Sequence, residues 1–75
     1  MSLGDVKLNT NCVVKEVNIK DEKIKTRLME LGLTKGCLVR VNRKSILKET
    51  LLIIFNSNYF TLKKNIAKQI LVNYA

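Results

Sequence analysis

Histidine is missing from the 75 residues, and cysteine, glycine and aromatic residues are scarce. Without histidine, the chain lacks the usual acid–base group of neutral-pH enzymes and cannot form a Cys–His nucleophile pair. The carboxylates are scattered, and their one adjacent pair, Asp21 and Glu22, is explained by helix capping. The glycines (Gly4, Gly32 and Gly36) lie too far apart for a phosphate-binding loop. We therefore expect no enzymatic activity.

The same scarcity excludes the common metal sites. A structural zinc site needs a full ligand set, and Cys12 and Cys37 form no Cys-x-x-Cys pattern and have no histidine to complete one. A ferrous facial triad needs histidines as well. Both cysteines lie in apolar, strand-like stretches, which favours buried, reduced thiols and a cytosolic setting. We expect no cofactor; the alternative is a transition-metal ion at a surface or shared site.

Long apolar stretches are also missing. The longest run, residues 51–55, falls far short of the ~20 residues that a membrane span requires. The N-terminus has neither the basic start nor the apolar segment of a signal peptide. We expect a cytoplasmic chain with one domain over residues 1–75, in which residues 1–4 are disordered or left over from cloning.

Positive charge is in excess, with 14 Lys and Arg against 6 Asp and Glu and a formal net charge of +8. This balance predicts attraction to nucleic acid, an anionic membrane or an acidic protein face. The candidate partner-binding surface consists of basic residues: Lys23, Arg27, Arg40, Arg43, Lys44, Lys63 and Lys64. Barrels that bind single strands also need stacked aromatics. Tyr59 and Phe60 are adjacent on one strand, and sheet packing explains them better.

Alternating apolar residues predict five short strands, at residues 12–19, 37–43, 51–55, 59–62 and 69–73. The first alternates imperfectly, so its core face stays open. The third is apolar throughout, which predicts a central strand buried on both faces. Residues 56–58 predict a hairpin turn, residues 43–49 a loop or exposed strand start, and residues 63–68 a helical turn that buries Ile66 or Ala67.

A single amphipathic helix is predicted between the first two strands. Asp21 is a plausible N-cap, and Ile24, Leu28 and Leu31 share the apolar face. Five short strands are expected to form a curled, partly open, barrel-like sheet, with this helix plugging one opening and a short helical turn before the last strand. In the polar segment before the first strand, Leu8 is the expected inward anchor.

Two turns follow the helix. Gly32 comes where a helix C-cap needs a left-handed residue, and Leu33 where a Schellman motif returns an apolar side chain to the last turn. Residues 34–36 make a second reversal before the next strand.

These residues carry a motif, Arg-Leu-x-x-Leu-Gly-Leu-x-x-Gly over residues 27–36. A second signature follows in register: Phe60, Leu62, Ala67, Ile70 and Val72. With both motifs the sequence resembles, over about residues 8 to 73, the FeoA family, small SH3-like cytosolic proteins of bacterial ferrous iron uptake. The resemblance implies a mainly β, SH3-like fold and structural rather than catalytic motif residues: Leu28, Leu31, Gly32, Leu33, Gly36 and Ala67.

The resemblance also implies a partner. FeoA proteins act beside FeoB, a membrane permease with a cytosolic GTPase domain, so we expect a non-enzymatic accessory protein that works by protein–protein interaction. It would be cytoplasmic and peripheral at the inner membrane face, where its charge suits an anionic leaflet. Two alternatives remain: a basic barrel that binds nucleic acid, and a transition-metal-responsive regulatory domain, because the same fold occurs in iron-dependent repressors.

Overall fold

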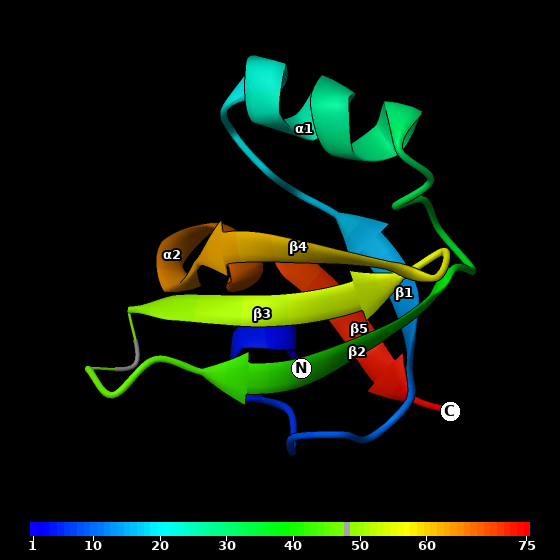
Figure 1. The fold of residues 1–75 in the computed structure, drawn as a ribbon. Coiled ribbons are helices and arrows are strands. Elements are labelled where there is room, and N and C mark those ends of the chain that lie inside the picture. Colours follow the sequence, from blue (N-terminus) through cyan, green and yellow to red (C-terminus); the bar gives the residue numbers. More distant parts are fainter. Residues whose placement is uncertain (48) are drawn as a thin grey trace.

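The computed structural model describes residues 1–47 and 49–75. In this part of the chain, five strands form an antiparallel sheet in the order β4-β3-β2-β1-β5 (Figure 1). The strands are β1 (Cys12–Val17), β2 (Leu38–Lys44), β3 (Thr50–Phe55), β4 (Asn58–Lys63) and β5 (Ile70–Tyr74). The helices are η1 (Leu3–Asp5), α1 (Glu22–Glu30) and α2 (Lys64–Ala67).

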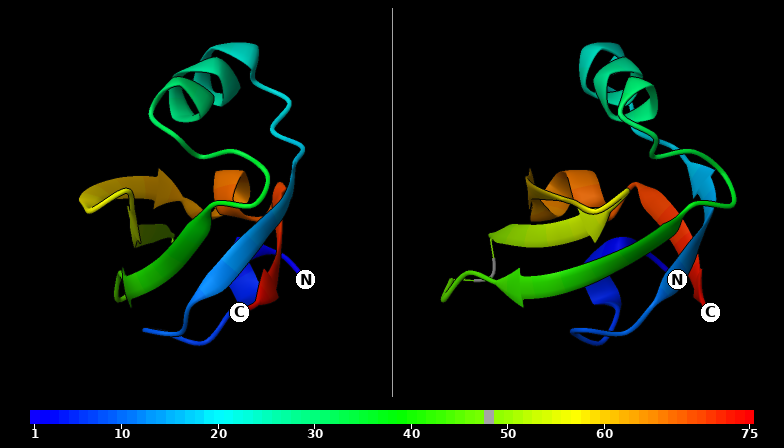
Figure 2. Two further views of the ribbon diagram at one scale, coloured as in Figure 1. Left: turned by 90° about the vertical axis from the view of Figure 1, so that its right-hand side faces the viewer. Right: turned by 45° about the vertical axis from the view of Figure 1, so that its right-hand side comes forward.

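The sheet curls because β2 changes partner along its length. Leu38 and Val39 pair with β1, whereas residues 40–44 pair with β3. Figure 2 shows the resulting bend between the β1–β5 pair and the β2–β3–β4 ribbon. The sheet ends at β4 on one side and β5 on the other, so the barrel is open. The predicted mainly β fold, with α1 between the first two strands and α2 before the last, is confirmed.

The first residues pack on the sheet, which corrects the expectation that residues 1–4 are disordered. Leu3 is fully buried in η1, and Ser2 forms a β-bridge with Leu71. The Met1 carbonyl accepts the Val72 N–H at 2.9 Å. Leu8, the expected anchor, is instead 47% exposed. The N-terminal backbone therefore pairs with β5. The local sequence pattern does not reveal this pairing, because the two segments are far apart in the chain.

A bulge explains the imperfect alternation of β1. Cys12 and Val14 are buried, but the pairing with β5 shifts register between Val14 and Glu16. The extra residue reverses which side chains point inward, so Val17 packs against the core and Glu16 is exposed.

The apolar strand β3 is not central, which corrects a second prediction. It lies between β2 and β4, and β2 occupies the middle of the sheet. Leu51, Ile53 and Phe55 are buried, whereas Leu52 and Ile54 on the other face are half-buried. The strand alternates like its neighbours although every residue in the run is apolar.

Two hairpins connect β2, β3 and β4. The β3–β4 turn places Asn56 and Ser57 at φ 51° and 63°, as the predicted turn requires. The predicted loop at residues 43–49 begins later than expected, because β2 continues to Lys44; Lys48 lies outside the described residues. After β4, α2 buries Ala67 completely.

Candidate functional site: a groove beneath α1

Helix α1 begins at the predicted N-cap. The Asp21 carboxylate accepts hydrogen bonds from the backbone N–H groups of Lys23 (3.0 Å) and Ile24 (3.2 Å). Glu22 in the first turn lies at the positive end of the helix dipole. The local sequence alone therefore fixes where the helix begins.

The helix ends in the predicted Schellman motif. Gly32 has φ 109°, and its N–H donates to the Met29 carbonyl at 3.1 Å, while the Leu33 N–H donates to the Leu28 carbonyl at 2.9 Å. Leu33 is fully buried against the core. Leu31 is different from what we expected: it is the C-cap residue and is 42% exposed, so the buried helix face is narrower than the predicted one.

Side chains from elsewhere fasten both ends of α1 to the sheet. The Asn56 side-chain amide in the β3–β4 turn donates to the Leu31 carbonyl at 2.9 Å. A Cβ at Gly32 would clash with that amide, so only glycine leaves room for it. Before the helix, the Lys20 N–H donates to the Gln69 side-chain oxygen at 2.8 Å. Hydrogen bonds therefore attach α1 to other elements at both of its ends, and the helix lies above the sheet (Figure 1).

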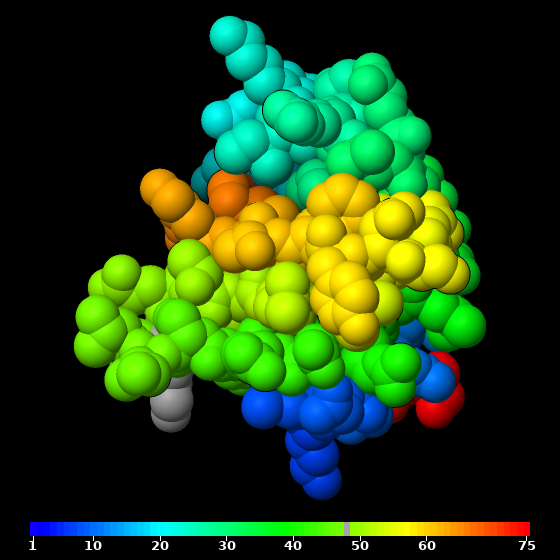
Figure 3. Space-filling view, viewed as in Figure 1, coloured from blue at the N-terminus to red at the C-terminus, as the bar shows by residue number. Residues whose placement is uncertain are grey.

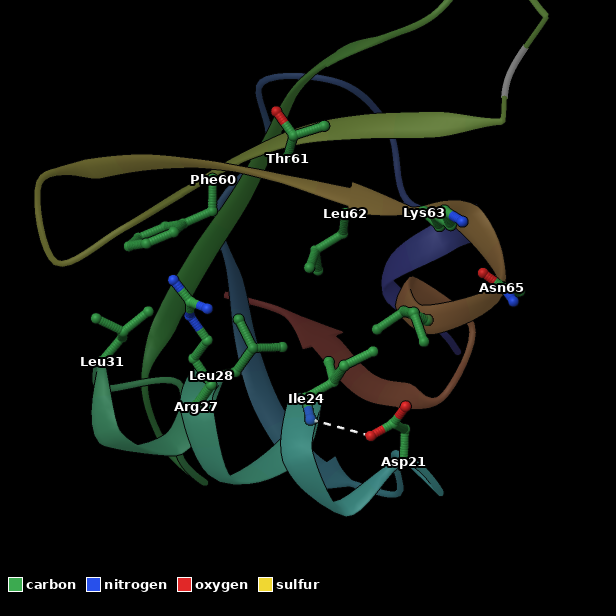
Figure 4. A pocket seen from close by; sticks show the side chains of 11 residues that line it. Asp21, Ile24, Arg27, Leu28, Leu31, Phe60, Thr61, Leu62, Lys63 and Asn65 are labelled. Carbon is green, nitrogen blue, oxygen red and sulfur yellow. Dashed lines mark hydrogen bonds between the residues drawn. The ribbon is translucent and has the colours of Figure 1, made fainter.

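Between these two ends, a groove of about 600 Å³ separates α1 from β4 and α2 (Figure 4). Apolar side chains from both walls line it: Ile24, Leu28 and Leu31 from the helix side, Phe60 and Leu62 from β4, and Ile66 from α2. Polar residues complete the lining: Asp21, Arg27, Thr61, Lys63 and Asn65. Leu28 is nearly buried, but Ile24, Phe60 and Ile66 remain partly exposed, so the groove offers apolar surface to a ligand.

The β4 wall of the groove is also a sheet edge. In an antiparallel hairpin closed by the Phe55–Asn58 pair, alternate residues direct their backbone groups away from the partner strand. On β4 these residues are Tyr59, Thr61 and Lys63. A free edge of this kind can accept a further strand. Phe60 faces inward and stacks on Phe55 with ring centroids 4.6 Å apart, which leaves Tyr59 as the exposed member of the aromatic pair.

The predicted basic surface does not form one patch. Lys23 and Arg27 lie on α1, and Arg27 reaches the groove. Arg40 lies on β2 opposite Ile54 and does not line the groove.

The other predicted basic residues gather where β2 ends and β3 begins. Arg43 pairs with Leu52, and Lys63 with Thr50. Lys64 follows directly as the first residue of α2. Lys44 turns inward, where its Nζ donates to the Gly4 carbonyl at 3.4 Å.

Sequence patterns do not single out the residues that build the groove. Asn56 is predictable as a turn residue, but its bond to the helix end depends on tertiary structure. The sequence marks Ile66 only as a core candidate, and Phe60 only as part of a family signature and of sheet packing. Half-buried residues that face each other across the groove from different elements leave no pattern in the local sequence.

Within residues 1–47 and 49–75, no group of three or more Cys, Asp or Glu side chains is placed to hold a metal ion. Both cysteines are free thiols, and Cys12 is buried while Cys37 is half-buried. Burial raises the pKa of each thiol, with a backbone hydrogen bond at Thr34 partly opposing this for Cys37. Neither thiol is therefore activated.

No helix in the described part of the chain has the length and apolarity needed to span a bilayer. No curated protein matches the chain.

Solved structures match it closely. A FeoA protein from Chlorobium tepidum is 28% identical with a TM-score of 0.91, over 99% of this chain and 70% of that one. FeoA from Stenotrophomonas maltophilia, solved with zinc and described as an SH3 domain protein and a candidate activating factor of ferrous iron transport, is 34% identical. Its TM-score is 0.84, over 97% of this chain and 89% of that one. A manganese-dependent transcriptional repressor shares the fold alone, at 15% identity and a TM-score of 0.86, over 100% of this chain and 41% of that one.

The match to a family model agrees with these structures. The model of the FeoA domain matches residues 1–74, which is nearly the whole chain and includes the N-terminal segment that packs on β5. The chain belongs to the FeoA family.

Proposed function

We propose that this protein is a non-enzymatic accessory factor of bacterial ferrous iron uptake that binds the cytosolic side of a FeoB-type permease. The family match over residues 1–74 supports the transport role, together with the description of the Stenotrophomonas relative as a candidate activating factor. The groove between α1 and β4 is the observation that carries the binding site.

The groove suits a polypeptide ligand. Apolar side chains on both walls can bury a short apolar segment, and the β4 edge offers backbone groups at Tyr59, Thr61 and Lys63 to the same segment. Arg27 and Lys63 at the lining favour acidic residues beside the apolar ones. We place the protein in the cytoplasm, where the permease's GTPase domain would present such a segment.

Association with detergent-solubilised FeoB from the same cell tests this proposal. It should be measured without nucleotide, with GDP and with a GTP analogue. Two matched variants locate the site: Leu31→Ser, which removes a groove residue that is 42% exposed, and Leu38→Ser, which removes a residue that is 58% exposed outside the groove. Both should fold, because neither side chain belongs to the buried core.

We expect Leu31→Ser to weaken association about tenfold, as the loss of a buried aliphatic side chain implies, and Leu38→Ser to leave it unchanged. Absence of association under every nucleotide condition would refute the role itself. Equal binding by both variants would refute the groove as the docking site.

A second candidate, a metal-responsive regulatory domain, is favoured by the fold shared with the manganese-dependent repressor and by the zinc bound to the Stenotrophomonas relative. A ligand that binds only the folded state raises the melting temperature. Ferrous, zinc or manganese ions should therefore raise the melting temperature of this chain if it senses metal, and an unchanged value would remove the candidate.

A further inference from the structure

The two hairpins of the sheet end in very different turns. The β3–β4 turn consists of Asn56 and Ser57, residues that suit a solvated turn. The β2–β3 turn instead carries Ile46 and Leu47, which are 98% and 77% exposed. These are the highest exposures of any large hydrophobic side chain in the described residues. Scattered apolar residues are ordinary on a surface, but an adjacent aliphatic pair at a projecting tip is not.

The base of this turn is ordered by hydrogen bonds. The Ser45 N–H donates to the Thr50 carbonyl at 3.0 Å. The Ser45 hydroxyl accepts from the N–H groups of Glu49 (3.1 Å) and Thr50 (3.2 Å). The strand ends therefore hold the tip away from the body of the molecule, where Figure 3 shows it projecting at the left.

Basic side chains surround the base of the same turn. Arg43 on β2 and Lys63 on β4 lie on either side of β3 and are exposed. Lys64 follows, and its N–H donates to the Glu49 carbonyl at 2.7 Å. The Glu49 side chain offsets part of this charge. The chain as a whole carries a formal net charge of +8. Arg43, Lys63 and Lys64 thus form a basic collar around the aliphatic tip. This arrangement suits a lipid bilayer, which is apolar in its interior and can be anionic at its headgroups.

We infer that the β2–β3 turn inserts Ile46 and Leu47 into the apolar boundary of an anionic lipid bilayer, with Arg43, Lys63 and Lys64 against the headgroups. The inference deepens the proposed function, on which it rests for its setting, because a partner of a membrane permease works next to the bilayer. Lys63 belongs both to this collar and to the groove lining, so the bound tip would hold one end of the groove near the membrane.

Vesicle co-sedimentation of the full chain at low ionic strength tests the inference. The protein should bind vesicles of phosphatidylcholine with phosphatidylglycerol and not vesicles of phosphatidylcholine alone. The double variant Ile46→Ser with Leu47→Ser should weaken binding about tenfold or more, because two aliphatic side chains lose their apolar environment. Lys63→Gln should weaken it about fivefold, because one cation near the surface is lost. Leu38→Ser is the matched control and should bind as the unmodified chain does.

Insertion itself has a clean optical readout, because the chain contains no tryptophan. The emission of Leu47→Trp should shift to the blue when anionic vesicles are added, and that of Leu38→Trp should not. No binding to anionic vesicles, unchanged binding of the double variant, or a water-like emission of bound Leu47→Trp would each overturn the inference.

Two further outcomes separate this inference from the proposed function. Leu31→Ser should bind vesicles normally while losing affinity for the permease. The tip variant should retain permease binding in detergent. If the unmodified chain does not bind vesicles and the double variant loses permease binding, the turn is a protein contact and not a lipid contact.

Discussion

The inner face of the sheet and the α1 face of the molecule both carry apolar side chains, but the side chains on the inner face are much more completely buried. Val41, Ile53 and Ile70 on the inner face have no exposed area. On the α1 face, Ile24 and Phe60 are only partly buried. The difference indicates that the sheet and the N-terminal segment supply most of the stability, whereas the α1 face leaves apolar surface exposed to solvent.

The largest expected change in the free energy of unfolding concerns a residue of the buried core. Leu3→Ala should lower the free energy of unfolding by about 2–5 kcal/mol, because a fully buried leucine leaves a cavity when truncated. Leu8→Ala, in the same segment but 47% exposed, should change it by less than about 0.5 kcal/mol. Urea denaturation of both variants measures the difference, and similar values would mean that the N-terminus is not part of the core.

A second comparison concerns the two left-handed glycines on either side of Leu33. Gly32→Ala should cost about 2–3 kcal/mol, because it adds backbone strain and displaces the Asn56 amide from the Leu31 carbonyl. Gly36 has φ 92°, but no atom lies within 4 Å of the position that a Cβ would take there. Gly36→Ala should therefore cost only the strain, about 1 kcal/mol.

Thermal or urea unfolding of the two glycine variants gives both values. If they are equal, the bond from Asn56 does not contribute to holding the end of α1.

The smallest effect is kinetic. Cys12 is fully buried in the core, whereas Cys37 is half-buried in the segment that leads from α1 to β2. Because burial raises both thiol pKa values, little thiolate is present at neutral pH, and the alkylation rate of Cys37 should rise about tenfold per pH unit below its pKa. Cys12 should react only when the whole chain unfolds.

Iodoacetamide labelling followed by mass spectrometry measures the two rates. Equal rates for the two cysteines would show that the α1 face opens no more readily than the core.

Elements with strong local signals were predictable from the sequence. The cap at Asp21, the Schellman motif at Gly32 and the turn at Asn56 depend on neighbouring residues, and all were confirmed. The alternation of apolar residues located all five strands to within a few residues. The SH3-like family resemblance was confirmed over nearly the whole chain.

Features that depend on distant pairing were not predictable. The burial of Leu3 follows from the pairing of its neighbour Ser2 with Leu71 of β5, which is about as far away in sequence as this chain allows. The exposure of Leu31 follows from its position at the helix end, where the chain turns away before the face is complete. The groove exists because α1 is hydrogen-bonded to other elements at both ends and buries only Leu28 between them, and no periodicity encodes that arrangement.

The central claim is that the groove beneath α1 receives the permease, and amide NMR tests it most directly. The cytosolic domain of FeoB should be titrated into the ¹⁵N-labelled chain. We predict that the perturbed amides cluster at Ile24, Leu31, Thr61 and Lys63 and that Leu31→Ser strongly reduces the perturbations at equal concentration. Perturbations confined to residues outside the groove, around Leu38 and Arg40 on β2, would contradict the account.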